Sequence, residues 1–181
     1  MTELMLLRHA KSDWTDRETD FERGLNERGR VSCNIMAERL AFHHFDPDLI
    51  LCSTARRCQL TASYLSEADM LVDWPEKTKY LDSLYLADHR TIAQLIEEQA
   101  QEAALAGHPV KRICVIAHNP GLSDLGWALL GERTAIAADI AAQMPTAAYL
   151  WMQLADLTHL APASAEVKAY EWPRQFYDFE A

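Results

Sequence analysis

The chain contains short runs of bulky apolar residues separated by longer polar or amphipathic stretches. Two of these runs, Leu4–Leu7 and Arg112–Ala117, show almost no alternation with polar residues, which is typical of strands buried on both faces of a parallel sheet. Further strands are expected at Asp48–Cys52, Met70–Trp74, Ala147–Leu154 and Val167–Trp172. A proline-containing loop joins the last two, so we expect them to form an antiparallel pair.

Stretches with helical spacing of apolar residues follow several of these strands, and polar residues at their starts mark N-caps. The expected helices run from the N-cap Asn26 to about His43, from Ala55 to Ser66 after the capping pair Ser53-Thr54, from His89 to Ala106, and from the cap Ser123 to about Leu130. The polar stretch 11–28 is expected to be a long loop. For the alanine-rich stretch 131–145, a short helix and an irregular insert are both open.

Strands that alternate with helices predict an α/β fold. We expect three layers, with a mostly parallel central sheet and helices on both of its faces. A chain of 181 residues with 49% hydrophobic residues can bury a sizeable core, and it has no room for a second large domain. The whole of residues 1–181 is therefore expected to form a single domain.

The net charge is -10, which argues against nucleic acid or an anionic membrane surface as the main partner, because both need a broad basic face. No run of residues approaches the roughly 18 apolar residues of a membrane span, and the start lacks the order of a signal peptide. We expect a cytoplasmic protein. The four cysteines show no paired spacing of a zinc site. No other cluster of ligands suggests a metal, and no cofactor is expected.

Arginine or histidine residues follow three of the expected strands. Arg8 and His9 come after the first strand, Arg57 comes just after the second, and His118 with Asn119 comes after Arg112–Ala117. The carboxyl ends of parallel strands lie at the same edge of a sheet, so these residues are expected to converge there. A guanidinium group binds two phosphate oxygens at once and disfavours protonation of a neighbouring imidazole. The pattern therefore predicts a phosphate pocket with a histidine that is free to attack.

At these residues the chain resembles a known family. Leu7-Arg-His-Ala10 is similar to the Arg-His-Gly signature of the histidine phosphatase superfamily, which includes the cofactor-dependent phosphoglycerate mutases. The stretch from Ser53 to Ala62 resembles its second motif, and His118-Asn-Pro-Gly121 resembles its third. The run Arg-His-Ala-Lys-Ser-Asp-Trp and the stretch Asp20–Leu25 resemble the small phosphohistidine phosphatases of the SixA type. The chain departs from the family pattern at Ala10 in place of glycine, Thr54 in place of proline and Leu60 in place of glutamine.

The resemblance implies a phosphoglycerate mutase-like fold and a phosphatase that hydrolyses phosphohistidine on a protein. It implies that His9 is the nucleophile that becomes phosphorylated, with Arg8, Arg57 and His118 holding the phosphoryl oxygens. In the second motif of the family, the arginine stands four residues after the serine, so counting from Ser53 selects Arg57 over Arg56. Further expected contacts to the substrate come from Arg23, Asn119 and Lys11. The implied partners are phosphorylated proteins such as histidine-containing phosphotransfer domains or phosphocarrier proteins.

A general acid cannot be identified from the sequence. Asp13, Asp82 and Asp88 are candidates, and each is also explained as a loop or capping carboxylate. A leaving imidazole is less basic than an alkoxide and needs less help from an acid, so a missing acid favours phosphohistidine over phosphate monoesters. Two alternatives remain: a small-molecule phosphomonoester phosphatase of the same fold, and a module that binds phosphorylated partners without turnover.

Overall fold

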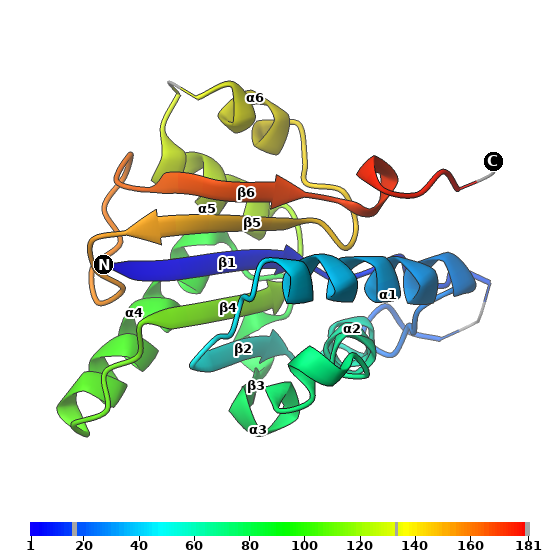
Figure 1. Cartoon of the computed structure of the whole chain (residues 1–181), viewed down its shortest axis with the longest axis horizontal. Coiled ribbons are helices and arrows are strands. Elements are labelled where there is room, and N and C mark those ends of the chain that lie inside the picture. The colour runs from blue at the N-terminus through cyan, green and yellow to red at the C-terminus, as the bar shows by residue number, and fades with distance from the viewer. Residues whose placement is uncertain (16–17, 133, 180–181) are drawn as a thin grey trace.

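The fold is built on a six-stranded sheet in the order β3-β2-β4-β1-β5-β6 (Figure 1). The computed structural model describes residues 1–15, 18–132 and 134–179. The strands are β1 (Thr2–Arg8), β2 (Leu49–Ser53), β3 (Thr78–Leu81), β4 (Arg112–Ala117), β5 (Tyr149–Leu154) and β6 (Glu166–Glu171). Strands β3, β2, β4 and β1 run parallel, whereas β5 and β6 are antiparallel to their neighbours. The mostly parallel sheet and its antiparallel final pair were both predicted.

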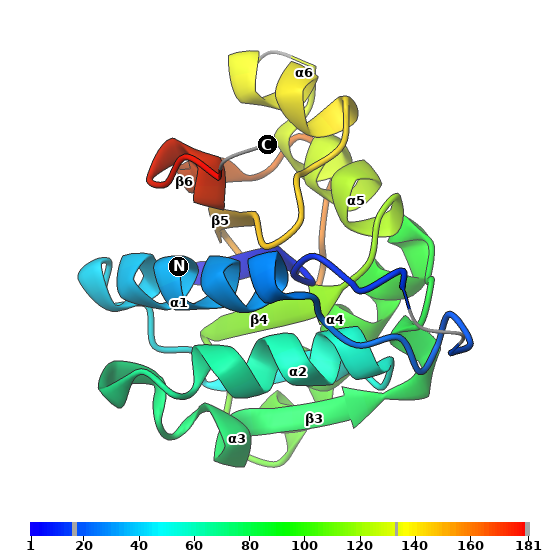
Figure 2. The same ribbon diagram turned by 90° about the vertical axis from the view of Figure 1, so that its right-hand side faces the viewer.

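Helices cover both faces of the sheet, which confirms the three-layer prediction (Figure 2). The helices are α1 (Glu27–Phe42), α2 (Arg56–Leu65), α3 (Trp74–Lys77), α4 (His89–Leu105), α5 (Gly121–Leu130) and α6 (Ala135–Ala141). Buried residues of α1, α2 and α3 form one core with the sheet, and those of α4, α5 and α6 form the other. No helix in the described part of the chain is long and apolar enough to cross a membrane.

Strand β1 is the centre of this arrangement because it pairs with β4 on one side and β5 on the other. Its residues Leu4 to Leu7 are at most 1% exposed, as expected for an apolar run without alternation. Leu4 and Leu6 contribute to one core and Met5 and Leu7 to the other, because successive side chains of a strand point to opposite faces. The strand thus ends with Arg8 between two firmly packed layers.

The prediction of a strand at Met70–Trp74 is wrong. Residues Asp69–Leu71 form a turn of 3-10 helix and α3 begins at Trp74, with Pro75 in its first turn. Leu71 and Trp74 are buried, but Met70 and Val72 are exposed, so the buried residues have helical rather than strand spacing. The third parallel strand is β3, whose sequence Thr-Lys-Tyr-Leu has a weak apolar signal because it lies at the edge of the sheet.

Two predicted helix caps are also wrong, although the helices themselves are present. Helix α5 begins at Gly121, and Ser123 lies buried within its first turn. Helix α2 has Ala55 as its N-cap, without a capping side chain: the Thr54 hydroxyl donates to Asp82, and the Ser53 hydroxyl reaches only the amide of Ala55 itself, at 3.3 Å, besides His118. Asn26 caps α1 as predicted, since its side chain accepts a hydrogen bond from the Gly29 amide. Within the stretch that was left open, the short helix α6 is present.

The first turn of α1 packs directly against the backbone that follows His9. A Cβ atom added at Gly29 would lie 2.3 Å from the main-chain oxygen of Lys11, which is far too close. We therefore expect Gly29→Ala to lower the free energy of unfolding by about 1–3 kcal/mol, as in other overpacked sites, although alanine favours helix formation.

Urea unfolding measures this loss, and Gly24→Ala is the matched control. A Cβ atom at Gly24 meets its nearest neighbour, a Leu60 methyl group, at 3.4 Å, an ordinary contact. A Gly29→Ala protein as stable as the Gly24→Ala protein would contradict the close approach of α1 to Lys11.

Candidate active site

One pocket, of about 210 Å³, lies at the carboxyl ends of the parallel strands. Arg8 ends β1, His9 follows it, and His118 follows β4, while Arg57 lies in the first turn of α2 just after β2. The pocket is lined by Arg8, His9, Lys11, Ser12, Trp14, Asp20, Arg23, Arg57, Leu86, His118, Asn119 and Thr146. All seven residues that the sequence analysis selected therefore line a single pocket.

The His9 ring is held by a main-chain hydrogen bond. Its Nδ1 lies 2.8 Å from the carbonyl oxygen of Ala10. Because a carbonyl only accepts, Nδ1 carries the proton and the lone pair is on Nε2. The Ala10 amide donates in turn to the hydroxyl of Thr61 (3.0 Å), and that hydroxyl donates to the Arg57 carbonyl (2.7 Å). Helix α2 thus fixes the orientation of the His9 ring through Thr61 and Ala10.

His9 is only 7% exposed, and this burial is the main reason why its pKa falls to about 3. The neighbouring His118, Arg57 and Arg8 lower its pKa further by repelling a positive charge, although the hydrogen bond to Ala10 acts in the opposite direction. The imidazole is therefore neutral near pH 7. A neutral ring with a free Nε2 lone pair has the form that a nucleophile needs.

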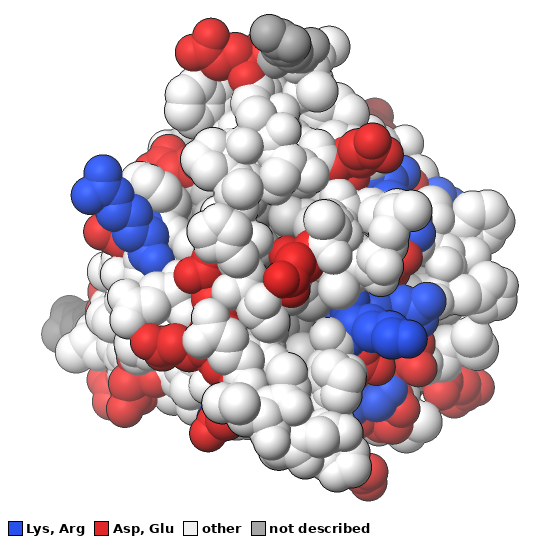
Figure 3. Space-filling model, turned by 90° about the vertical axis from the view of Figure 1, so that its left-hand side faces the viewer, with Lys and Arg blue, Asp and Glu red and all other residues white. Residues whose placement is uncertain are grey.

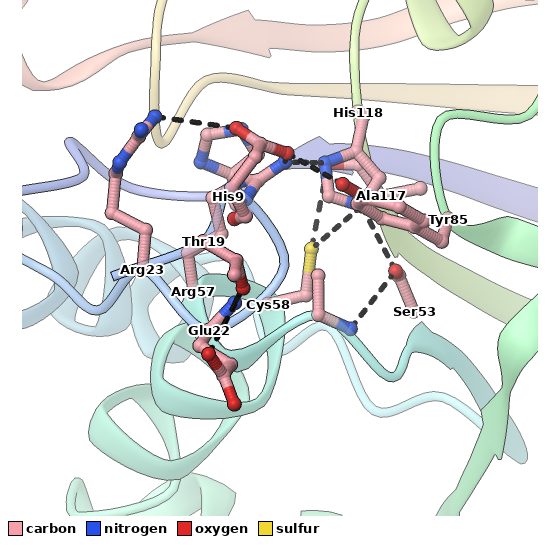
Figure 4. Close-up of polar contacts among 12 residues, drawn as sticks. His9, Thr19, Glu22, Arg23, Ser53, Arg57, Cys58, Tyr85, Ala117 and His118 are labelled. Atoms are coloured by element: carbon pink, nitrogen blue, oxygen red, sulfur yellow. Dashed lines mark hydrogen bonds and ion pairs between the residues drawn. The ribbon is translucent and has the colours of Figure 1, made fainter. Parts of the chain in front are cut away.

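His118 faces His9, with 5.2 Å between the ring centroids (Figure 4). Its Nε2 lies 2.8 Å from the hydroxyl of Ser53, and its Nδ1 lies 3.2 Å from Nη2 of Arg57. Since arginine only donates, Nδ1 accepts and Nε2–H donates to Ser53. Burial, followed by the charge of Arg57, lowers the pKa of His118 to about 4. The second histidine is thus also neutral near pH 7.

Two arginines of the pocket, Arg8 and Arg23, each have a buried donor without a hydrogen-bond partner in the described part of the chain. Arg8 donates through Nη1 to the carbonyl of Met144 (2.7 Å), but its buried Nε makes no hydrogen bond within the described residues. The buried Nε of Arg23 is likewise unpaired there. Burial and the charge of Arg57 lower the pKa of Arg8, as expected for cations held close together. Unused donors and crowded positive charge favour an anion with several oxygens, such as a phosphoryl group.

Asp20 is a site residue that the sequence analysis did not select. Its carboxylate accepts from the Tyr85 hydroxyl (2.6 Å), from Nη2 of Arg57 (3.1 Å) and from Nη1 of Arg23 (3.2 Å). The hydrogen bond from Tyr85 and the nearby Arg57 hold the pKa of Asp20 below its usual value. The ionised Asp20 carboxylate thus accepts hydrogen bonds from Arg23 and Arg57, two of the arginines that were predicted to bind phosphate.

The three carboxylates considered as general acids lie outside this pocket. Asp88 caps α4, Asp13 accepts from Thr15, and Asp82 accepts from Thr54. None of them lines the pocket among the described residues. Their hydrogen bonds are those of capping and loop carboxylates, which was the alternative explanation for each.

Asn119 and the stretch 131–145 meet behind the pocket. The Asn119 side-chain amide donates to the Met144 carbonyl (3.0 Å), the same oxygen that accepts from Arg8. Ser123 donates to Asn119 and accepts from the Met144 amide, each at 3.0 Å. The chain just after α6 therefore positions Arg8, a role that the alanine-rich sequence did not indicate.

The remaining predicted residues differ in their exposure. Lys11 is exposed at the pocket, and the guanidinium of Arg23 lies 3.7 Å from the ring centre of Trp14. Arg56, the neighbour of Arg57 that did not fit the spacing of the motif, does not line the pocket and pairs with Glu18 at 2.7 Å.

Within the described residues, no group of three or more His, Cys, Asp or Glu is placed to hold a metal ion.

Ser53, Thr61 and Tyr85 support the site and were not predicted as functional. Ser53 and Thr61 are buried beneath the two histidines, and both lie within the motif that selected Arg57. The sequence signal for them was their place in that motif. Tyr85 comes from the connection between β3 and α4, and no local pattern indicated that it would reach Asp20.

Comparison with known proteins agrees with this geometry. Residues 4–81 match the family model of the histidine phosphatase superfamily (branch 1). This segment contains β1, β2 and β3 and the residues Arg8, His9, Arg23 and Arg57. The match covers less than half of the chain; together with the fold, it makes the chain similar to the histidine phosphatase superfamily, which the motifs also resemble.

Solved structures of this fold include proteins with different substrates. SixA of Agrobacterium tumefaciens is 29% identical, with 95% of this chain and 99% of that chain aligned and a TM-score of 0.74. The protein histidine phosphatase SixA complexed with tungstate is 18% identical over 97% and 99% of the two chains, with a TM-score of 0.76. A mycobacterial glucosyl-3-phosphoglycerate phosphatase is 19% identical over 96% and 99%, with a TM-score of 0.59. The fold and the family match support a phosphatase and leave its substrate open.

The two neutral histidines make stability depend on pH. Their pKa values are about 3 and about 4 in the folded protein, against about 6.5 in an unfolded chain. As the pH falls below 6.5, the unfolded chain binds protons that the folded protein does not, so stability is lost. Between pH 7 and pH 5 this loss is about 2 kcal/mol for each histidine.

Urea unfolding of wild type and of His118→Asn at pH 7 and pH 5 measures the effect. We expect the variant to lose about 2 kcal/mol less than wild type on acidification, since asparagine does not titrate. His9→Asn is expected to behave in the same way. Equal losses in wild type and both variants would show that the rings are already protonated in the folded protein.

Proposed function

We propose that the protein is a phosphatase that hydrolyses phosphohistidine on a protein through a phosphorylated His9. The observation that carries the proposal is the neutral His9 ring, held by the Ala10 carbonyl within a ring of cations. Arg8, Arg23, Arg57 and His118 bind the phosphoryl oxygens, with Lys11 and Asn119 at the edge of the pocket. The similarity to SixA of Agrobacterium tumefaciens supports this substrate class.

In the first step, Nε2 of His9 attacks phosphorus in line with the departing group. The bond from phosphorus to the substrate imidazole breaks, and the departing nitrogen takes a proton from water. The arginines offset the charge on the equatorial oxygens, which lowers the barrier. When a phosphoryl dianion approaches His118, it favours the protonated ring, which then donates to a phosphoryl oxygen.

In the second step, water attacks phosphorus on phospho-His9, and the bond to Nε2 breaks. Phosphate leaves and His9 returns to its neutral form. Asp20 is the ionised carboxylate of the pocket, and it accepts the proton that the attacking water loses. The incoming phosphoryl group competes with Asp20 for Arg23 and Arg57, which frees this carboxylate for the water.

The group that leaves phosphorus in the first step is the reason why we propose phosphohistidine as the substrate. Asp20 is ionised when the substrate arrives, because the hydrogen bond from Tyr85 and the nearby Arg57 hold its pKa below the usual value, so it carries no proton for the leaving group of the first step. A leaving imidazole tolerates a poor donor better than an alkoxide does. Phosphorylated partners such as histidine-containing phosphotransfer domains and phosphocarrier proteins carry such a leaving group.

A second candidate function is a small-molecule phosphomonoester phosphatase, and Asp20 is the observation that favours it. The second function requires that Asp20, once displaced from both arginines, takes up a proton before the leaving group departs; the negative phosphoryl oxygens beside it favour that protonation. The residue would then be better able to protonate an alkoxide.

Phosphate release from a phosphohistidine protein and from a phosphate monoester, measured side by side, separates the two functions. We expect release from phosphohistidine to be at least about 100-fold faster in kcat/KM, since general acid catalysis contributes about 10²–10⁴-fold where it operates. His9→Ala is the control and should abolish both activities. Comparable or faster release from the monoester would favour the second function, and full activity of His9→Ala would rule out His9 as nucleophile.

A further inference from the structure

A second cavity, of about 280 Å³, lies beside the catalytic pocket. Thr146 lines both, so the two are neighbours at the same edge of the molecule. The cavity is lined by Arg28, Ser32, Pro145, Thr146, Trp172, Pro173, Arg174 and Phe179. We call it the C-terminal cavity, because half of its lining comes from the segment after β6, on the side of the molecule that Figure 2 presents.

Within the described residues, the positive charge of the C-terminal cavity is not paired with a carboxylate. Arg28 and Arg174 are both exposed, and no described Asp or Glu lies within ion-pair distance of either guanidinium or lines the cavity. The guanidinium of Arg28 lies 4.7 Å from the ring centre of Phe179. Stacking of this kind holds an arginine in place while its hydrogen-bond donors stay available.

The opposite end of the molecule is different. Acidic and basic side chains are interspersed there (Figure 3). The hollow near the amino ends of β1 and β4 is lined by Glu3 and Asp48 as well as by Lys111 and Arg112. In a protein with a net charge of -10, arginines therefore outnumber carboxylates in the described lining of the catalytic pocket, where Asp20 is the one carboxylate, and of the C-terminal cavity. Such a local field attracts an anionic group that the protein as a whole repels.

Apolar side chains accompany these cations at the surface. Trp14 and Leu86 line the catalytic pocket and are 70% and 57% exposed, and Trp172 and Phe179 are half-buried in the C-terminal cavity. Exposed aromatic residues beside arginine are typical of surfaces that bind another protein. A small phosphorylated molecule held in the catalytic pocket would leave both groups exposed.

We propose that the C-terminal cavity binds acidic side chains of the phosphorylated partner protein, next to the phosphohistidine that enters the catalytic pocket. Arg28 and Arg174 pair with Asp or Glu of the partner, and Trp172 and Phe179 cover the apolar part of the contact. This inference rests on the proposed function, because it assumes that the phosphoryl group is carried by a protein.

The test compares two synthetic phosphohistidine peptides that differ only in the residues flanking the phosphohistidine, Asp and Glu in one and Asn and Gln in the other. Their affinities are measured by fluorescence anisotropy on His9→Ala protein, which does not remove the phosphoryl group. We expect the acidic peptide to bind about tenfold more tightly, about threefold for each arginine, as for exposed ion pairs. Adding Arg28→Ala and Arg174→Ala should remove this preference.

Lys111→Ala is the matched control, because it removes an exposed cation at the opposite end of the sheet. A preference that is equal in all three proteins, or absent from the starting protein, overturns the docking proposal. Turnover of the neutral peptide by the protein with His9 intact tests the proposed function separately. Turnover without an acidic preference rejects docking alone, and an acidic preference without turnover rejects the catalytic function alone.

Discussion

The site depends on the His9 imidazole, which must stay neutral and in one tautomer although it is surrounded by positive charges. Burial and the charges of Arg8 and Arg57 lower the pKa of His9, and the Ala10 carbonyl places its proton on Nδ1. Neither effect is sufficient alone, because a neutral ring in the other tautomer would present Nδ1 as the acceptor. The rest of the fold serves this arrangement: β1 delivers His9 to the edge of the sheet, and Thr61 of α2 fixes the Ala10 backbone.

The same crowding of cations explains the position of Asp20. Holding Arg57 beside Arg8 and Arg23 is costly because like charges repel, and the carboxylate of Asp20 offsets part of this charge through its ion pairs with Arg23 and Arg57. A phosphoryl dianion carries more charge and more acceptor oxygens than one carboxylate, so it competes well for the same donors. In the proposed mechanism, Asp20 therefore keeps Arg23 and Arg57 positioned until the phosphoryl group displaces it.

The sequence predicted the three-layer fold because uninterrupted apolar runs mark strands with two buried faces, and β1 and β4 are such strands. It predicted Arg8, His9, Arg57 and His118 as one cluster because parallel strands end at the same edge. It failed at β3, whose edge position requires little apolar sequence, and at Ser123, whose hydroxyl serves Asn119 and Met144 instead of a helix end. Asp20 and Tyr85 were missed because they meet only when two separate loops are folded together.

The central claim is that Nε2 of His9 receives the phosphoryl group. Brief exposure to ³²P-labelled phosphoramidate, followed by alkaline quenching and peptide mapping, tests it directly. The account predicts an acid-labile label on His9, attached at Nε2, because Nδ1 carries the proton that the Ala10 carbonyl accepts. A label at Nδ1 of His9, on His118 or on another residue would contradict the account, and so would turnover without any label on the protein.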